Sequence, residues 1–137
     1  MKYYAVIDTN VVVSAMLKKD SLPARIINEI FLGSIIPVVS DTIIAEYEEV
    51  LSRKKFKFPA QTVSDLIEQI KLRAIFLDGI SVNENFPDPD DIVFYEVVME
   101  ARENSDAYLV TGNLKHFPSK PFVVTPHEML EIIIKGQ

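Results

Sequence analysis

Short apolar runs alternate along the chain with longer segments in which apolar residues recur at helical spacing. The short runs predict β-strands at residues 3–7, 35–39, 75–77, 107–110 and 122–124. The longer segments predict helices from about residue 11 and at residues 23–31, 40–53, 61–73, 89–103 and 126–134. Because strands that alternate with helices are joined by crossovers, we expect a three-layer α/β/α fold with a mostly parallel central sheet.

The composition is that of one globular domain. The chain has 137 residues, of which 48% are hydrophobic and 25% are charged, and it carries no internal repeat. We therefore expect a single domain over residues 1–137. The first apolar run is too short for a signal peptide, and no run approaches the roughly 20 residues needed to span a membrane. This pattern predicts a cytoplasmic protein without a membrane segment.

Residue counts limit the chemistry of any metal site. The chain has no cysteine and two histidines, which excludes thiolate ligands and leaves too few imidazoles for a zinc site. Any metal must therefore be bound by oxygen. The net charge of −6 argues against a broad basic surface for nucleic acid, but a carboxylate cluster that binds cations would itself contribute negative charge.

The first predicted strand ends at an acid. Residues 3–7 are largely apolar, Asp8-Thr9-Asn10 follows, and apolar residues resume at Val11. If residues 3–7 form a buried parallel strand, Asp8 lies at its carboxyl end, where open α/β sheets form the crevices that bind ligands. Asp8 is therefore the first candidate for chemistry.

The helix predicted from residue 40 carries three glutamates that differ in their relation to its apolar face. Glu46 and Glu48 flank opposite edges of that face, whereas Glu49 points away from it. The helical wheel does not choose between Glu46 and Glu48. A solvated glutamate at the boundary of the face is the simpler interpretation of either residue.

Acids also open the helix predicted from residue 89, which is apolar on almost every side. Asp88 can be its N-cap, Pro89 its first residue, and Asp91 the third-position acid that bonds back to the cap. A functional role is the alternative. It is stronger for Asp91, because an acid in the first turn of a buried helix faces other parts of the protein rather than bulk water.

A second predicted strand also ends at polar residues. Thr111 and Asn113 follow strand 107–110 and should lie on the same edge of the sheet as Asp8. Asp106 precedes that strand, roughly 20 Å from Asn113 at a rise of about 3.3 Å per residue. A structural role at the strand entry is therefore favoured for Asp106.

A cluster of basic and aromatic residues follows the glutamate helix. Residues 53–58 read Arg-Lys-Lys-Phe-Lys-Phe. Lys54, Lys55 and Lys57 could contact RNA phosphates while a phenylalanine stacks on a base. The competing interpretation is that the cations complement a helix C-terminus and that both phenylalanines belong to the core.

Taken in order, these features resemble the PIN-domain ribonucleases, and in particular the branch described as toxin components of bacterial toxin–antitoxin pairs (VapC-like). Essentially the whole chain takes part in the resemblance. The motifs that carry it are Asp8-Thr9-Asn10, Ser40 with Glu46, residues 48–56, Asp88-Pro89-Asp90-Asp91 and residues 106–117.

The resemblance implies an endoribonuclease that depends on Mg²⁺ or Mn²⁺, with Asp8, Glu46 and Asp91 as metal ligands and catalytic residues. It thereby selects Glu46 over Glu48. It also implies an RNA substrate, a cognate antitoxin and a homodimer. The residues that would orient the ligands or the substrate are Asn10, Ser40, Thr111 and Asn113.

Two other functions stay open at this point. The family often has a fourth acid where this chain has Asn113, so the site could bind one metal ion rather than two, or persist only as a binding module. A metal-dependent phosphohydrolase would use Asp8 as a covalent nucleophile. Its haloacid-dehalogenase motif, Asp-x-Asp, ends here in Asn10, which counts against it.

Overall fold

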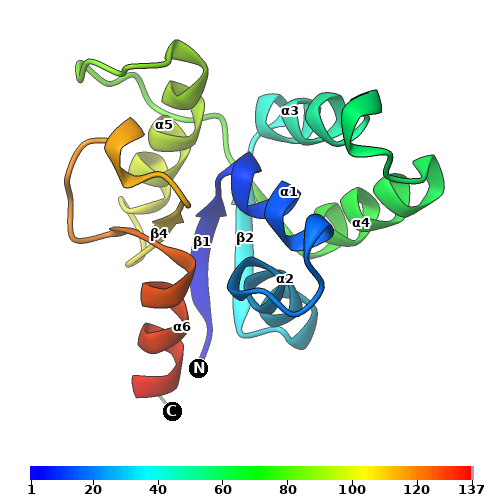
Figure 1. Ribbon diagram of the computed structural model, residues 1–137. Coiled ribbons are helices and arrows are strands. Elements are labelled where there is room, and N and C mark those ends of the chain that lie inside the picture. The colour runs from blue at the N-terminus through cyan, green and yellow to red at the C-terminus, as the bar shows by residue number, and fades with distance from the viewer. Residues whose placement is uncertain (137) are drawn as a thin grey trace.

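Five parallel strands form the central sheet of the protein. The computed structural model describes residues 1–136. The strands lie in the order β3-β2-β1-β4-β5, which places β1 at the centre (Figure 1). They are β1 Tyr3–Ile7, β2 Ile35–Val39, β3 Ile75–Phe76, β4 Tyr108–Val110 and β5 Val123–Val124. All four strand pairs are parallel, so the predicted parallel sheet is confirmed.

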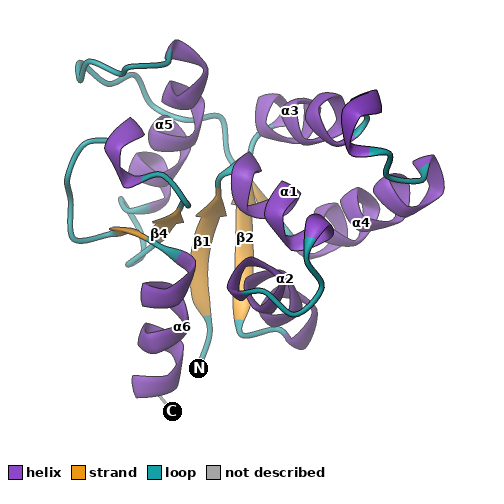
Figure 2. Ribbon diagram, in the orientation of Figure 1, coloured by secondary structure: helices purple, strands orange, loops and turns teal. Residues whose placement is uncertain are grey.

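Six helices flank the sheet and complete the predicted three-layer fold (Figure 2). They are α1 Thr9–Leu17, α2 Leu22–Leu32, α3 Asp41–Leu51, α4 Ala60–Arg73, α5 Ile92–Ala101 and α6 Pro126–Lys135. The predicted helix 89–103 is wrong at its start, because residues 89–91 form a 3₁₀ turn and the α-helix begins at Ile92. Within residues 1–136, no helix combines the length and the apolar character needed to cross a bilayer.

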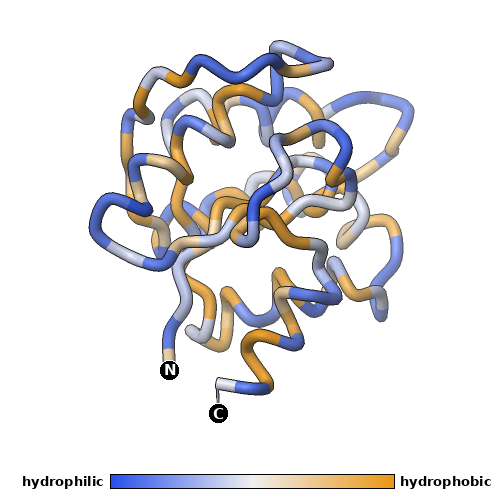
Figure 3. Tube along the Cα trace, turned by 90° about the vertical axis from the view of Figure 1, so that its left-hand side faces the viewer, coloured by the Kyte–Doolittle hydropathy of each residue, from blue (hydrophilic) through white to orange (hydrophobic). Residues whose placement is uncertain are grey.

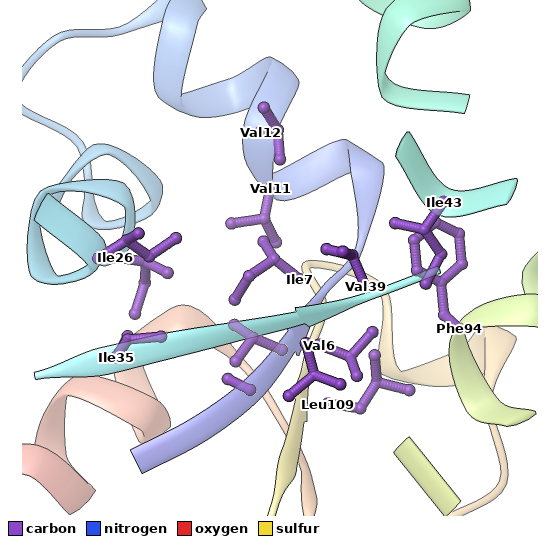
Figure 4. Packing of buried hydrophobic residues seen from close by; sticks show 14 of the residues in the cluster. Val6, Ile7, Val11, Val12, Ile26, Ile35, Val39, Ile43, Phe94 and Leu109 are labelled. Atoms are coloured by element: carbon purple, nitrogen blue, oxygen red, sulfur yellow. The ribbon is translucent and has the colours of Figure 1, made fainter. Parts of the chain in front are cut away.

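Branched apolar side chains fill the space between the layers. Val6 of β1 lies opposite Leu109 of β4 in the sheet register. Figure 4 shows this pair on one side of the sheet, with Ile7 and Val11 on the side of α1. Figure 3 shows that hydrophobic segments gather at the centre of the molecule, whereas the peripheral loops are mostly hydrophilic. Burial on both faces explains why the central strands read as continuous apolar runs, whereas both residues of the edge strand β3 are exposed.

Local signals in the sequence set several helix ends. Ser21 caps α2, because its hydroxyl accepts a hydrogen bond from the backbone N–H of Ala24. The same helix ends at Gly33, whose φ of 90° is a left-handed conformation that glycine adopts without a Cβ clash. Thr125 and Glu128 form a reciprocal capping box at the start of α6.

The carboxyl end of β1 is surrounded by helices. In Figure 1, α3 and α5 lie on either side of the tip of β1, and α1 begins directly after it. The buried hydroxyl of Tyr47 on α3 donates a hydrogen bond to the carbonyl oxygen of Ile7, the last residue of β1. This bond fixes α3 against the strand end. It therefore also determines where the preceding residue, Glu46, lies.

Candidate metal centre and active site

An open cleft of about 390 Å³ lies at the carboxyl end of β1. The residue directly after β1, helices α1 and α3, the segment that follows α3, the turn before α5 and the turn after β4 line it. Two of the lining residues carry basic groups, Arg53 and His116. The acids that line it are Asp8, Glu46, Asp88, Asp90 and Asp91. The cleft therefore combines a high density of carboxylates with few compensating cations.

Asp8 lies at the base of this cleft. It is the N-cap residue of α1, and only 5% of its surface is exposed. The hydroxyl of Thr111 donates a hydrogen bond of 2.7 Å to its Oδ2 atom. Burial raises the pKa of the Asp8 carboxyl, although the Thr111 hydroxyl and the first backbone N–H groups of α1 partly offset this increase. The strand end thus holds a buried acid.

Glu46 approaches Asp8 from α3. It is half-buried, and the hydroxyl of Thr9 donates a hydrogen bond to its Oε2 atom. Burial raises the pKa of Glu46, and the charge of Asp8 adds to the increase. Glu48 is exposed and lines a different cleft, between α3 and α4. The structure therefore brings Glu46, and not Glu48, to the side of Asp8.

Asp91 reaches the cleft from the third side, at the N-terminus of α5. Its side chain is 15% exposed, and its Oδ2 atom lies 3.1 Å from Nδ1 of His116. Burial and the charges of Asp8 and Asp88 raise the pKa of Asp91 to about 6. Three carboxyls from separate elements, all with raised pKa values, thus face one cleft.

The predicted capping roles of the acids before α5 are only half correct. Asp88 does cap the turn, because its Oδ1 atom accepts a hydrogen bond of 2.9 Å from the backbone N–H of Asp90. Asp91 does not bond back to this cap, since its side chain is paired with His116. Because residues 89–91 form a tight 3₁₀ turn, the Asp91 carboxylate faces the cleft and not Asp88.

The residues expected to orient ligands differ in their contacts. Thr111 contacts Asp8 directly. The backbone N–H of Asn113 donates to the Thr111 hydroxyl at 3.0 Å, and the exposed Asn10 accepts a hydrogen bond of 3.2 Å from the Gly112 N–H. Ser40 instead caps α3 through the N–H of Ile43, so its contribution is to position the helix that carries the glutamate.

Two further acids, Asp106 and Asp90, differ from the three carboxyls in being exposed. Asp106 is exposed and precedes β4, at the opposite edge of the sheet from the cleft. Asp90 lines the cleft but is exposed, and its charge contributes to the raised pKa of Glu46. The predicted separation of Asp106 from the strand-end site is confirmed.

The donor set suits a hard divalent cation. Mg²⁺ and Mn²⁺ prefer oxygen ligands, and the three carboxylates supply them. One oxygen of each carboxylate is held by a hydroxyl or an imidazole, an arrangement that orients metal ligands in proteins. Within residues 1–136, however, no three acidic or histidine side chains lie close enough together to form a completed metal-binding group.

We expect the stability of the protein to reflect these raised pKa values. A carboxyl whose pKa is raised on folding stabilises the folded state at low pH, and this stabilisation is lost as the pH rises through the folded value. For Asp91 the loss falls between its ordinary pKa of 3.8 and about 6. It amounts to up to about 3 kcal/mol, at about 1.4 kcal/mol per pKa unit.

The Asp91→Asn variant should therefore lose less stability between pH 5 and pH 7 than the wild type, in the absence of divalent cations. Its melting temperature at pH 7 should be a few degrees higher. Asparagine keeps an oxygen that accepts a hydrogen bond from His116, so the contact itself is preserved. Thermal unfolding at several pH values measures the difference, and parallel curves for the two proteins would contradict the raised pKa.

Three residues at the cleft were not found from the sequence. The sequence does not single out Thr9 from its neighbours Asp8 and Asn10, although a hydroxyl beside a strand-end acid is a natural donor. It places Arg53 in the basic cluster and gives no sign that Arg53 lines the cleft. His116 carried no positional signal, because its contact with Asp91 joins residues that are 25 positions apart.

The basic and aromatic cluster lies at the rim of the cleft. Phe56 and Arg53 line the cleft, and the guanidinium of Arg53 makes two hydrogen bonds of 2.7 Å to Glu49. Phe56 and Phe58 stack on each other at 5.4 Å, and both are half-buried. Lys54, Lys55 and Lys57 are exposed. The phenylalanines thus pack partly against the core, and among the exposed lysines Lys55 has its ammonium 5.1 Å from the centre of the Phe56 ring.

Comparison with known proteins identifies the family. The family described as PIN domain matches residues 4–115, which is most of the chain and includes Asp8, Glu46 and Asp91, whereas His116 lies one residue beyond the match. A comparison with curated proteins gives no significant match. PIN domains are generally nucleases, and they generally use divalent metal ions. The parallel sheet, the acids at its carboxyl edge and this match lead to one conclusion: the chain belongs to the PIN-domain family.

Proposed function

We propose that the protein is an endoribonuclease that hydrolyses RNA phosphodiester bonds with Mg²⁺ or Mn²⁺, acting as one domain over residues 1–137. The observation that carries this proposal is the convergence of three carboxyls from separate elements on one cleft. Asp8 comes from the end of β1, Glu46 from α3 and Asp91 from the turn before α5. Acids at the carboxyl edge of a parallel sheet are placed where such folds bind ligands.

The groups around the cleft have different roles in the proposed reaction. Thr111, Thr9 and His116 each hold one carboxylate oxygen and so restrict the direction of the three acids. The mutual repulsion of these acids favours binding of a divalent cation. A bound Mg²⁺ or Mn²⁺ would supply a nucleophile from water at neutral pH and would stabilise charge on the leaving oxygen.

Arg53 is placed to bind a phosphate next to the reacting one. Its guanidinium lies at the rim of the cleft and is fixed by Glu49, which lowers the entropy lost when a phosphate binds. The planar guanidinium can offer paired N–H groups to phosphate oxygens. The exposed lysines that follow it can contact further phosphates along the strand.

Replacing Lys54, Lys55 and Lys57 together with glutamine should weaken RNA binding and flatten its dependence on salt. Each phosphate contact on a single strand contributes about 0.7 to the slope of log affinity against log salt, so three contacts contribute about 2. Binding can be measured by fluorescence anisotropy in an Asp8→Asn background, which should leave the RNA uncut. As a control, Lys19, Lys71 and Lys135, which do not line the cleft, are replaced together with glutamine, so that the same amount of charge is removed. An unaltered slope would assign the cluster to structure alone.

The finer biological role is also part of the proposal. The motifs that resemble the toxin branch support a cytoplasmic toxin that pairs with an antitoxin and forms a homodimer. The neighbouring ends of α2 and α4 carry exposed apolar residues that offer surface for a protein partner. These residues are Phe31, Leu32 and Leu72. The two helix ends are adjacent, because Arg73 lies 5.4 Å from the ring of Phe31.

Incubation of the purified protein with mixed RNAs and with DNA of matched sequence tests the enzymatic proposal. We expect cleavage of RNA in millimolar Mg²⁺ or Mn²⁺, and none after chelation with EDTA. RNA binding without cleavage in any divalent cation would instead support a binding module with a degenerate site. A covalent aspartyl-phosphate trapped on Asp8 would support the phosphohydrolase.

A further inference from the structure

The loop after β4 carries a continuous hydrogen-bonded path between two of the three acids. The path starts at Asp8, whose Oδ2 atom accepts from the Thr111 hydroxyl at 2.7 Å. The same hydroxyl oxygen accepts from the backbone N–H of Asn113 at 3.0 Å. The Asn113 side-chain nitrogen lies 2.9 Å from Nε2 of His116, and Nδ1 of His116 lies 3.1 Å from Oδ2 of Asp91.

The direction of the last two bonds follows from the groups involved. An amide nitrogen only donates, so Nε2 of His116 must accept from Asn113 and carry no proton. A carboxylate accepts, so Nδ1 must carry the proton and donate to Asp91. Both contacts thus require the same neutral form of the imidazole, the tautomer protonated at Nδ1. An aspartate at position 113 has no N–H and could not select this tautomer.

We propose that Asn113 and His116 act as a positioning pair, in which Asn113 fixes the Nδ1-protonated tautomer of His116 and His116 directs the Asp91 carboxylate into the metal site. In this pair, Asn113 is used for its side-chain N–H group rather than as a metal ligand. Because His116 binds only Oδ2, the other carboxylate oxygen takes no part in this bond. This inference rests on the proposed metal site.

Nitrogen-15 NMR of the imidazole tests the first half of the proposal without any metal. The chemical shifts of Nδ1 and Nε2 distinguish the two neutral tautomers, and His116→Ala identifies the signal against that of His127. We expect the Nδ1-protonated form in the wild type and its loss in Asn113→Asp. Predominance of the Nε2-protonated form in the wild type would overturn the proposal.

Mn²⁺ affinity, measured by electron paramagnetic resonance, tests the second half. His116→Ala should weaken Mn²⁺ binding by about 10- to 100-fold, which is the usual cost of losing a group that orients a metal ligand. His116→Asn should restore most of the affinity, because its amide nitrogen lies the same number of bonds from the backbone as Nδ1. His116→Gln should not, since its amide nitrogen corresponds to Nε2.

The outcomes separate this proposal from the proposed function. Tight Mn²⁺ binding by the wild type with equal affinity in His116→Ala would overturn the positioning pair and leave the metal site intact. Failure of the wild type to bind Mn²⁺ would overturn the metal site and the role of the pair in it. Rescue by asparagine and not by glutamine, together with the Nδ1-protonated signal, is the result that supports the pair.

Discussion

Asp8→Asn should reduce RNA cleavage by at least about 100-fold. Loss of a group that merely orients a metal ligand commonly costs 10- to 100-fold, so removal of a ligand charge at the base of the cleft should cost at least as much. Asp8 is 5% exposed, and its charge contributes to the raised pKa of both other carboxyls, Glu46 and Asp91. Asparagine preserves its shape and can still accept a hydrogen bond from Thr111.

A matched control separates this effect from a general change in charge. Glu48→Gln removes the same charge from an exposed glutamate that lines a different cleft, and it should leave cleavage unchanged. The Asp8→Asn protein should remain folded, because its substitution removes a buried charge rather than adding one. Equal cleavage by the wild type, Asp8→Asn and Asp91→Asn would point to a contaminating nuclease and would refute the assignment.

Divalent cations should raise the melting temperature of the wild type by roughly 8 °C. A cation present at about 100 times its dissociation constant stabilises the folded state by about 2.7 kcal/mol. For a domain of this size, each kcal/mol corresponds to about 3 °C. Burial raises the pKa values of all three carboxyls, and the cation binds their ionised forms, so the shift should be larger at pH 7.5 than at pH 5.

The same melting experiment contains its own control. Asp8→Asn should lose most of the shift, while Glu48→Gln should retain it. Differential scanning fluorimetry with Mn²⁺, with Mg²⁺ and with a monovalent salt of matched ionic strength distinguishes specific binding from screening of surface charge. A shift of equal size in wild type and Asp8→Asn would place the cation elsewhere.

The fold followed closely from the sequence because its strands, apart from the exposed edge strand β3, are largely buried. Continuous apolar runs bounded by polar residues are the signature of parallel strands, and all five predicted strands are present. The position of Asp8 followed from the same rule, since it is the first polar residue after such a run. Helix limits set by Gly33 and Thr125 were equally local.

The composition of the site was less predictable because it depends on contacts between distant segments. The helical wheel left Glu46 and Glu48 equivalent. Their difference comes from the bond between Tyr47 and Ile7, which joins residues 40 positions apart. The resemblance to the PIN-domain ribonucleases selected Glu46 without supplying this physical reason.

The segment before α5 shows how a correct local signal can mislead. The sequence allowed a capping box, in which Asp91 would bond back to Asp88, as the alternative to a functional role that was stronger for Asp91. Asp88 satisfies the Asp90 N–H instead and tightens the chain into a 3₁₀ turn. The freed Asp91 then pairs with His116, a residue contributed by a loop that no local pattern could bring to this place.

Crystals soaked in Mn²⁺ and measured near the manganese absorption edge provide the decisive observation. We expect an anomalous peak in the cleft, at about 2.1–2.3 Å from carboxylate oxygens of Asp8, Glu46 and Asp91. Soaked crystals of Asp8→Asn should lack this peak or show it much reduced. A wild-type protein without manganese in the cleft, or with manganese bound only by other residues, would contradict the assignment of these three acids as one metal centre.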